Sequence, residues 1–152
     1  MRTIKFRARR KNGEWVVGNF IHHFATCFKN KERYSIFLPK PKNDNDGYWV
    51  EDIEPQTIGQ FTGLKDKNGK EIYEGDVLKQ VKKSSREGCE SSSYDKNNFE
   101  VVFKYGSFWL QRPYSDSVYI RDFPNIDEFV GFECFEIVGN IYENPELLET
   151  EL

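Results

Sequence analysis

The sequence has few of the residues, and none of the segments, that mark several large classes of protein. Its 152 residues include three cysteines, an odd number without CxxC spacing, which predicts neither a closed disulfide framework nor a zinc site. Reduced thiols of this kind suit a cytoplasmic protein. The longest apolar run is far shorter than the ~18–20 residues of a membrane-spanning helix. No apolar segment follows the basic residues 1–11, as one would in a signal peptide. We therefore expect no membrane association.

Motifs of nucleotide binding and hydrolysis are also missing. The chain contains no GxxxxGKS/T, GxGxxG, HExxH or GxSxG pattern. His22, His23 and Cys27 form a cluster that could serve catalysis, but neighbouring residues of a strand point to opposite faces. The acidic groups at 51–54 and 127–128 lack the spacing of a glycosidase or a metal centre. We expect no catalytic, cofactor-binding or metal-binding residue, and we infer no small-molecule substrate.

What the chain does have is aromatic residues and alternation. It contains 13 Phe, 8 Tyr and 3 Trp, each of which buries roughly 150–250 Å² when packed. Apolar and polar residues alternate with period two along much of the chain, which predicts strands. Asn-Gly pairs at 12–13 and 68–69 predict tight hairpins with positive φ at both turn positions. Asn144-Pro145 predicts the start of a short C-terminal helix. The expected class is mainly β, built from short antiparallel hairpins.

The order of these elements predicts two parts. Residues 1–60 form an N-terminal β unit, and residues 61–152 contain a hairpin, a small SH3-like β-barrel at about 72–143 and the terminal helix. Because burial falls with size, neither part is expected to be stable alone, and we predict one cooperative unit. The serine-rich residues 84–98 contain almost no apolar side chains, which predicts a mobile loop.

Charge is distributed unevenly along the chain. Residues 2–11 carry six cations and no anion, whereas residues 127–151 carry eight anions and no cation, within a net charge of -3. This polarity predicts pairing of the two ends, within one fold or between subunits, or the steering of a charged partner. The alternatives stay open at this level.

Two groups of residues are candidate interaction sites. The first contains cations on predicted strand faces, and the second contains aromatic residues of a predicted hairpin at 99–111, which also includes Phe103 and Tyr105. The aromatic residues either fill the core or stack on nucleic-acid bases. The residues that we single out are Lys5, Arg7, Arg9, Lys82, Lys83, Phe108 and Trp109.

Three blocks of sequence resemble the YopX family of phage and prophage proteins. Residues 3–8 (TIKFRA) resemble its opening, residues 60–77 (QFTGLKDKNGKEIYEGDV) its central signature and residues 135–148 (FEIVGNIYENPELL) its end. The blocks follow the family's order and span nearly the whole chain. Arg9-Arg10 stands where family members often place an aromatic residue, and residues 22–47 and 84–98 match nothing known in the family.

The resemblance implies a mainly β fold and a small accessory protein in the cytoplasm of a bacterial host. It implies no defined activity or site residues. The first hypothesis is therefore non-enzymatic binding or assembly through protein contacts, including self-association as a homo-oligomer. The alternative is a nucleic-acid-binding β-barrel module that uses the basic strand faces and the aromatic hairpin. An enzyme that uses Cys27 or the acidic groups is a residual hypothesis.

Overall fold

The computed structural model describes residues 3–23, 33–38, 49–81, 98–112 and 135–149. The chain divides into two compact units, Met1–Phe61 (unit 1) and Thr62–Leu152 (unit 2). The described residues of both units form antiparallel strands joined by turns, and α-helix is absent from these ranges. The mainly β class predicted from the sequence is confirmed.

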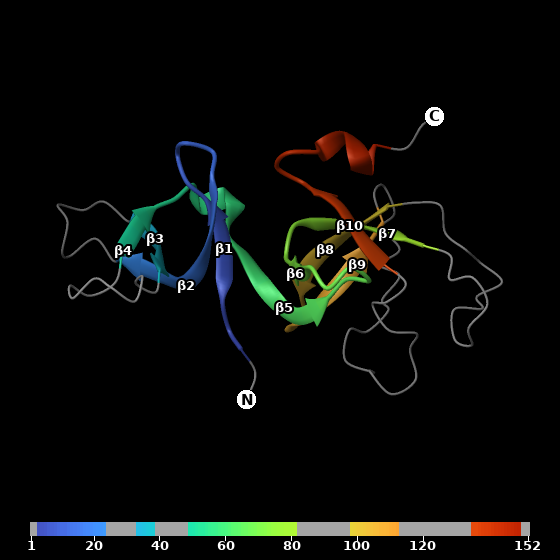
Figure 1. The fold of residues 1–152 in the computed structure, drawn as a ribbon, viewed down its shortest axis with the longest axis horizontal. Coiled ribbons are helices and arrows are strands. Elements are labelled where there is room, and N and C mark those ends of the chain that lie inside the picture. The colour runs from blue at the N-terminus through green and yellow to red at the C-terminus, as the bar shows by residue number, and fades with distance from the viewer. Residues whose placement is uncertain (1–2, 24–32, 39–48, 82–97, 113–134, 150–152) are drawn as a thin grey trace. The chain divides into compact units, whose positions relative to one another are not determined.

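Unit 1 is an antiparallel sheet with the strand order β4-β3-β2-β1-β5 (Figure 1). Because successive side chains of a strand point to opposite faces, the apolar side chains of these strands lie on one face of the sheet and form a shared core. Ala8, Val16, Ile36 and Ile53 are buried there, and Phe6, Phe20, Tyr34, Leu38 and Ile58 pack around them. The elements are β1 (Phe6–Arg9), β2 (Trp15–His23), β3 (Arg33–Leu38), β4 (Trp49–Asp52), the 3-10 turn η2 (Pro55–Thr57) and β5 (Gly59–Lys65).

Strand β2 pairs with a different neighbour along each half of its length. Its first half pairs with β1, as far as Gly18 opposite Phe6, and its second half pairs with β3, from Asn19 opposite Phe37. At the change-over the two backbones come very close: a Cβ on Gly18 would lie 2.2 Å from the carbonyl oxygen of Phe37. Glycine is required here because β3 occupies the space that a side chain would need.

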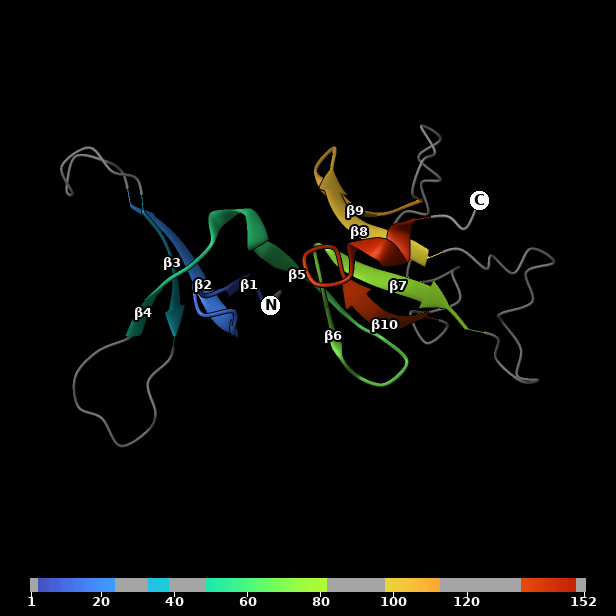
Figure 2. The same cartoon turned by 90° about the horizontal axis from the view of Figure 1, so that it is seen from above.

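Unit 2 begins within β5, which continues across the boundary and has β6 (Glu71–Tyr73) as its next neighbour. The four remaining strands form a second sheet with the order β10-β7-β8-β9 (Figures 1 and 2). They are β7 (Asp76–Gln80), β8 (Asn98–Lys104), β9 (Ser107–Gln111) and β10 (Phe135–Asn140). The core of unit 2 contains Ile72, Leu78, Phe99, Val101, Phe108 and Leu110.

The C-terminal end differs from the predicted helix. Pro145–Leu148 forms one 3-10 turn, η4, and the side chain of Asn144 makes no capping hydrogen bond. Asn98 Nδ2 donates to the carbonyl oxygen of Leu147 at 2.7 Å, which ties η4 to the start of β8. Leu147 also packs closely against Gly139, because a Cβ on Gly139 would lie 2.7 Å from Cδ1 of Leu147. The turn is therefore held by packing on the sheet rather than by helix capping.

Barrel closure is not seen in the described part of unit 2. The outer strands of its four-stranded sheet, β10 and β9, are not neighbours of each other in the strand order. The predicted loop at 84–98 lies almost wholly outside the described residues.

The predicted hairpins are present, but their turns differ from the prediction. At 12–13 and 68–69 only the glycine has positive φ, +92° at Gly13 and +79° at Gly69. Each turn is a three-residue connection, closed by the backbone pairs Arg10 with Glu14 and Asp66 with Lys70. Positive φ at both central residues occurs instead at Tyr105 (+52°) and Gly106 (+80°), between β8 and β9.

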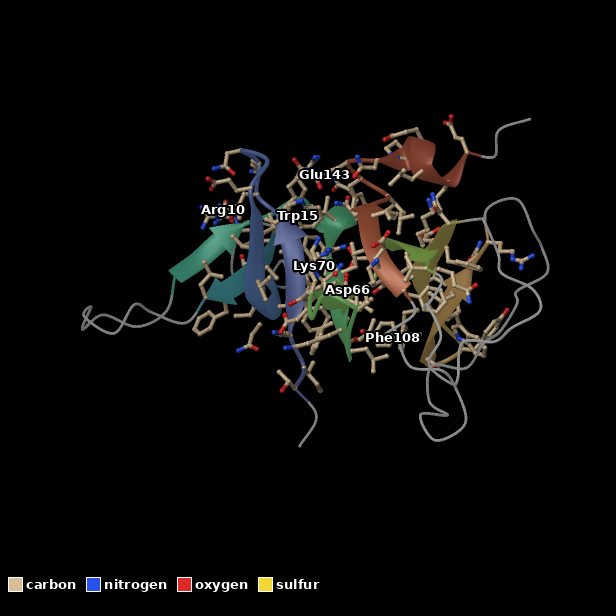
Figure 3. The ribbon with its side chains drawn as sticks, turned by 45° about the vertical axis from the view of Figure 1, so that its right-hand side comes forward. Arg10, Trp15, Asp66, Lys70, Phe108 and Glu143 are labelled. Carbon is tan, nitrogen blue, oxygen red and sulfur yellow. The ribbon has the colours of Figure 1, made fainter. Side chains whose placement is uncertain are left out.

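Asp66 joins the β5–β6 hairpin to β10. Its Oδ1 accepts the backbone N–H groups of Asn68 (2.8 Å) and Lys70 (2.9 Å), and its Oδ2 accepts that of Ile137 at 3.1 Å. Figure 3 labels Asp66 and Lys70 at the two ends of this turn. Next to it, the N–H of Lys67 donates to the carbonyl oxygen of Phe135 at 2.9 Å. One buried carboxylate thus connects residues 71 positions apart in sequence.

The surroundings of Asp66 act on its pKa in opposite directions. Burial acts to raise the pKa, but the N–H donors of Ile137, Lys70 and Asn68 outweigh it and hold the pKa below its ordinary value. The folded state therefore favours the charged carboxylate. Its stabilising contribution is present above the unfolded-state pKa of about 3.9 and is lost as the pH falls through the lower folded-state pKa.

We expect Gly18→Ala to destabilise unit 1, because the new Cβ would meet the carbonyl oxygen of Phe37 and, at 2.8 Å, Cγ2 of Ile36. Forced overpacking of this kind costs about 1–3 kcal/mol. Urea unfolding measures the change, with the exposed neighbour Asn19→Ala as the matched control. A Gly18→Ala variant within about 0.5 kcal/mol of the unsubstituted protein would contradict the close approach.

We expect Asp66→Asn to lower the free energy of unfolding at pH 7 by about 1–3 kcal/mol, because an amide cannot replace both acceptor oxygens. The difference from the unsubstituted protein should shrink as the pH falls below the unfolded-state pKa of about 3.9 and on through the lower folded-state pKa, because Asp66 itself then becomes protonated. Urea unfolding across this pH range tests the expectation. The exposed carboxylate variant Asp52→Asn is the control. A difference that stays constant over the range would rule out the charged carboxylate as its source.

Candidate functional site

Two cationic side chains, Lys5 just before β1 and Arg7 within it, lie over aromatic rings. Alternation places Lys5 and Arg7 on one face of the strand, opposite to the core residues Phe6 and Ala8. Nζ of Lys5 is 4.7 Å from the ring centroid of Phe61, and Cζ of Arg7 is 4.9 Å from that of Trp15. Contacts of this kind hold a long cationic side chain against the sheet and reduce its conformational freedom.

Val17 adds an apolar element to this surface. It lies directly opposite Arg7 in the β1–β2 ladder and is 42% exposed. Lys5, Arg7, Trp15 and Val17 form what we call the β1 face. Half-buried cations beside an exposed apolar side chain are suited to contact an acidic surface.

Arg9 and Arg10 of the same segment form ion pairs within unit 1. Nη2 and Nε of Arg9 both donate to Oε2 of Glu54, at 2.7 and 3.1 Å, and Nη1 of Arg10 pairs with Glu14 at 3.0 Å. The backbone N–H of Arg9 also donates to Thr57 Oγ1 at 2.8 Å. Arg9, which was singled out from the sequence as an interaction residue, thus ties β1 to η2.

The structure divides the aromatic hairpin into buried and exposed rings. Phe108 and Trp109 are only 4% and 8% exposed, so neither presents a face on which a base could stack. Phe108 belongs to the core of unit 2, and Trp109 Nε1 donates to the carbonyl oxygen of Lys104 at 2.6 Å. The exposed rings are Phe103 (45%) and Tyr105 (85%). The position of Tyr105 in the two-residue turn is the signal that could have identified it from the sequence.

The remaining sequence candidates give little further geometry. Lys82 and Lys83 lie outside the described residues, as does Cys27. The ring of His22 stacks on Tyr34, with centroids 4.5 Å apart and planes 7° apart. Within the described ranges, no three His, Cys, Asp or Glu side chains gather in a way that could hold a metal ion.

Two buried carboxylates in the block at residues 60–77 accept hydrogen bonds from backbone N–H groups. Besides Asp66, Asp76 is 1% exposed, and its Oδ2 accepts the N–H of Tyr73 at 2.8 Å. The sequence predicted a tight hairpin at 68–69, beside Asp66, but it did not predict that Asp66 and Asp76 would be buried acceptors. An acidic residue beside a glycine turn is the available signal.

Glu100 is the described acidic residue with a raised pKa. Burial raises it most, the nearby charge of Lys104 opposes this, and Glu74 adds to the increase. Glu100 lies opposite Val77 and Gln111 in the second sheet. Glu100 is thus a partly buried residue in the middle of a sheet. The residues opposite it, Val77 and Gln111, are not nucleophiles.

The two units have opposite formal charges. Residues 1–61 contain eleven Lys and Arg against seven Asp and Glu, a charge of +4, whereas residues 62–152 contain eleven against eighteen, a charge of -7. Together these give the net charge of -3 for the whole chain. The charge polarity predicted from the two ends therefore extends to the units as wholes.

Comparison with known proteins identifies the family but no activity. No curated protein matches the chain. Among solved structures, protein EF1440 from Enterococcus faecalis is similar, with a TM-score of 0.52 and 25% identity, over 98% of this chain and 100% of that one. None of the helical segments that the structure describes is long and apolar enough to cross a membrane. The family model described as YopX protein matches residues 5–149. The chain therefore belongs to the YopX protein family.

Proposed function

We propose that this protein acts by binding and assembly rather than by catalysis, and that the β1 face of one copy contacts the acidic C-terminal turn of another. The observation that carries the proposal is the separation of charge between the units, +4 in residues 1–61 and -7 in residues 62–152. Opposite charge on two compact parts of one chain favours contacts between unlike parts of neighbouring copies.

On the β1 face, the proposed contact uses fewer cations than the sequence predicted. Arg9 and Arg10 already pair with Glu54 and Glu14, so they contribute less to an external contact. Lys5 and Arg7 are each held over an aromatic ring. Because these side chains are already restrained, an anionic partner would order them at a smaller entropic cost.

On the acidic side, the proposed contact lies in η4. Glu146 of η4 and Glu149 directly after it are exposed. Glu136 of β10, in contrast, forms an ion pair with Lys67, and Glu143 accepts a hydrogen bond from Asn140. Unlike patches form a heterologous contact, which closes into a ring or continues as a chain of copies. Assembly should therefore depend on protein concentration and weaken with salt.

Light scattering at low and high salt tests the self-contact. We expect the unsubstituted protein to form oligomers at low salt, and both Lys5→Glu/Arg7→Glu and Glu146→Lys/Glu149→Lys to lower the mass toward that of one chain. A mixture of the two variants should assemble again, because opposite charges then face each other. Lys70→Glu, an exposed change in the β5–β6 turn, is the control. A single monomeric mass for the unsubstituted protein at every salt concentration would overturn the contact.

The alternative function is nucleic-acid binding through unit 1. The charge of +4 on residues 1–61 favours this function, because nucleic acids are anionic. Lys5 and Arg7 would contact phosphates, so the affinity should fall steeply with salt. The buried rings of Phe108 and Trp109 give no support to the stacking part of that hypothesis. Gel shifts with single- and double-stranded probes at low salt decide the question, since an absence of any shift would eliminate this function.

Three finer expectations belong to the same proposal. We propose that unit 2 contains an SH3-like barrel at about residues 72–143, supported by the return of β10 to pair with β7 in the order β10-β7-β8-β9. We also propose an accessory role in a phage or prophage, and a site of action in the cytoplasm of the bacterial host, both of which follow from the family resemblance.

A further inference from the structure

Strand β5 is shared by the two units and changes partners at the boundary between them. On the side of unit 1, the N–H of Phe61 donates to the carbonyl oxygen of Lys5 at 2.9 Å. On the side of unit 2, which begins at Thr62, the next neighbour of the strand is β6. The chain therefore passes from one unit to the other inside a strand.

Gly63 has a left-handed backbone just after this boundary. Its φ is +94°, and it is the one glycine of positive φ in the described ranges that lies inside a strand rather than in a turn. A Cβ on Gly63 would meet no atom within 4 Å, so packing leaves room for a side chain. Only the backbone conformation requires glycine here, and glycine adopts either sign of φ at similar cost. A glycine of this kind inside a strand marks a local bend.

The segments on the two sides of Gly63 are anchored in different cores. Ile58 packs against the core of unit 1 and Leu64 packs against the core of unit 2, and no described residue belongs to both cores. Parts of a chain with separate cores change orientation unless a large apolar interface holds them. Because Phe61 is still bonded to Lys5, such a change would be absorbed after Phe61. Gly63 is the residue there with the widest choice of backbone conformation.

The side chain of Thr62 fastens this bend. Its Oγ1 donates to the carbonyl oxygen of Ile72 in β6 at 2.9 Å and accepts the N–H of Leu64 at 3.2 Å. Thr62 is only 8% exposed, so both bonds are largely shielded from water. The hydroxyl thus holds the backbone on both sides of Gly63. A single neutral hydroxyl adds modest net stability, so this fastening can open without unfolding either core.

We propose that Gly63 is a hinge about which unit 1 and unit 2 change orientation, and that the hydroxyl of Thr62 is a latch that favours the described backbone conformation at the hinge. Hinges are formed by a few residues, often small ones, that absorb large changes in φ and ψ. The β1 face belongs to unit 1 and η4 to unit 2, so a hinge lets the two surfaces meet partners at a range of angles. The hinge does not depend on the self-contact of the proposed function.

Residual dipolar couplings of the backbone N–H groups test the hinge in the unsubstituted full chain. We expect the described residues of each unit to fit one alignment tensor, and the two tensors to differ in magnitude, because motion between the units averages their alignment differently. A single tensor that fits both units would show one rigid body and overturn the proposal. High salt weakens the charge contact of the proposed function, so at high salt the result is independent of that contact.

Distances between two spin labels test the role of Gly63. One label is attached at Lys11→Cys in the β1–β2 turn of unit 1 and the other at Lys79→Cys in β7 of unit 2, both exposed positions. Dilution of the labelled chain with unlabelled chain restricts the measured distances to those within one molecule. Serine replaces the three native cysteines, which are Cys27, Cys89 and Cys134.

We expect Gly63→Ala to shift the distance distribution, because alanine disfavours positive φ. The described hinge conformation should lose at least about fivefold in population relative to conformations with negative φ. Gly69→Ala is the matched control, since Gly69 also has positive φ (+79°) and no atom within 4 Å of an added Cβ, but lies in a turn within unit 2. This control should leave the distribution unchanged. An unchanged distribution for Gly63→Ala would make this glycine a fixed bulge and overturn the hinge.

We expect Thr62→Val to broaden the same distribution, because valine keeps the shape of threonine but makes neither hydrogen bond of the latch. Thr62→Ser, which keeps the hydroxyl, should have the width of the unsubstituted chain. Equal widths for all three chains would overturn the latch. If a substituted chain does not fold, the alignment tensors of the unsubstituted protein still decide between a hinge and one rigid body.

Discussion

The arrangement of unit 2 depends on one buried carboxylate that accepts backbone hydrogen bonds from its own turn and from a strand far away in sequence. Asp66 closes its own turn through Asn68 and Lys70 and holds β10 through Ile137. Backbone N–H groups that are buried need acceptors, and a charged acceptor that serves several of them forms stronger bonds than a neutral one. The hairpin and the last strand are therefore coupled, although their contact spans most of unit 2 in sequence.

The same central block supplies a second connection. The amide of Gly75 donates to the carbonyl oxygen of Val101 in β8, and the carbonyl oxygen of Gly75 accepts the N–H of Ile141 just after β10. Gly75 has φ of +80°, and the carboxylate of Asp76 satisfies the N–H of Tyr73 beside it. This short turn thus contacts both neighbours of β7. In this chain, the block at residues 60–77 therefore positions the strands around it.

How far the sequence predicted the surfaces can be judged from particular residues. Alternation placed Lys5 and Arg7 on one face of β1, which the rings under them bear out. The same alternation could not show that Arg9 would pair with Glu54, because that pairing depends on where η2 meets β1. Nor could it separate the buried Trp109 from the exposed Tyr105 four residues earlier. Both have aromatic side chains, and their burial is decided by the turn between β8 and β9.

By itself, the sequence determined the β class, the positions of the hairpins, the uneven charge and the family, because alternation, glycine turns and charge are local properties of the chain. Tertiary structure decided which cations are paired internally, which rings reach solvent, and which carboxylates became buried backbone acceptors. These outcomes depend on residues brought together from distant positions, as Asp66 and Ile137 are. The backbone conformation of the turns also depends on the folded structure: Tyr105 has positive φ, whereas Asn12 and Asn68 do not.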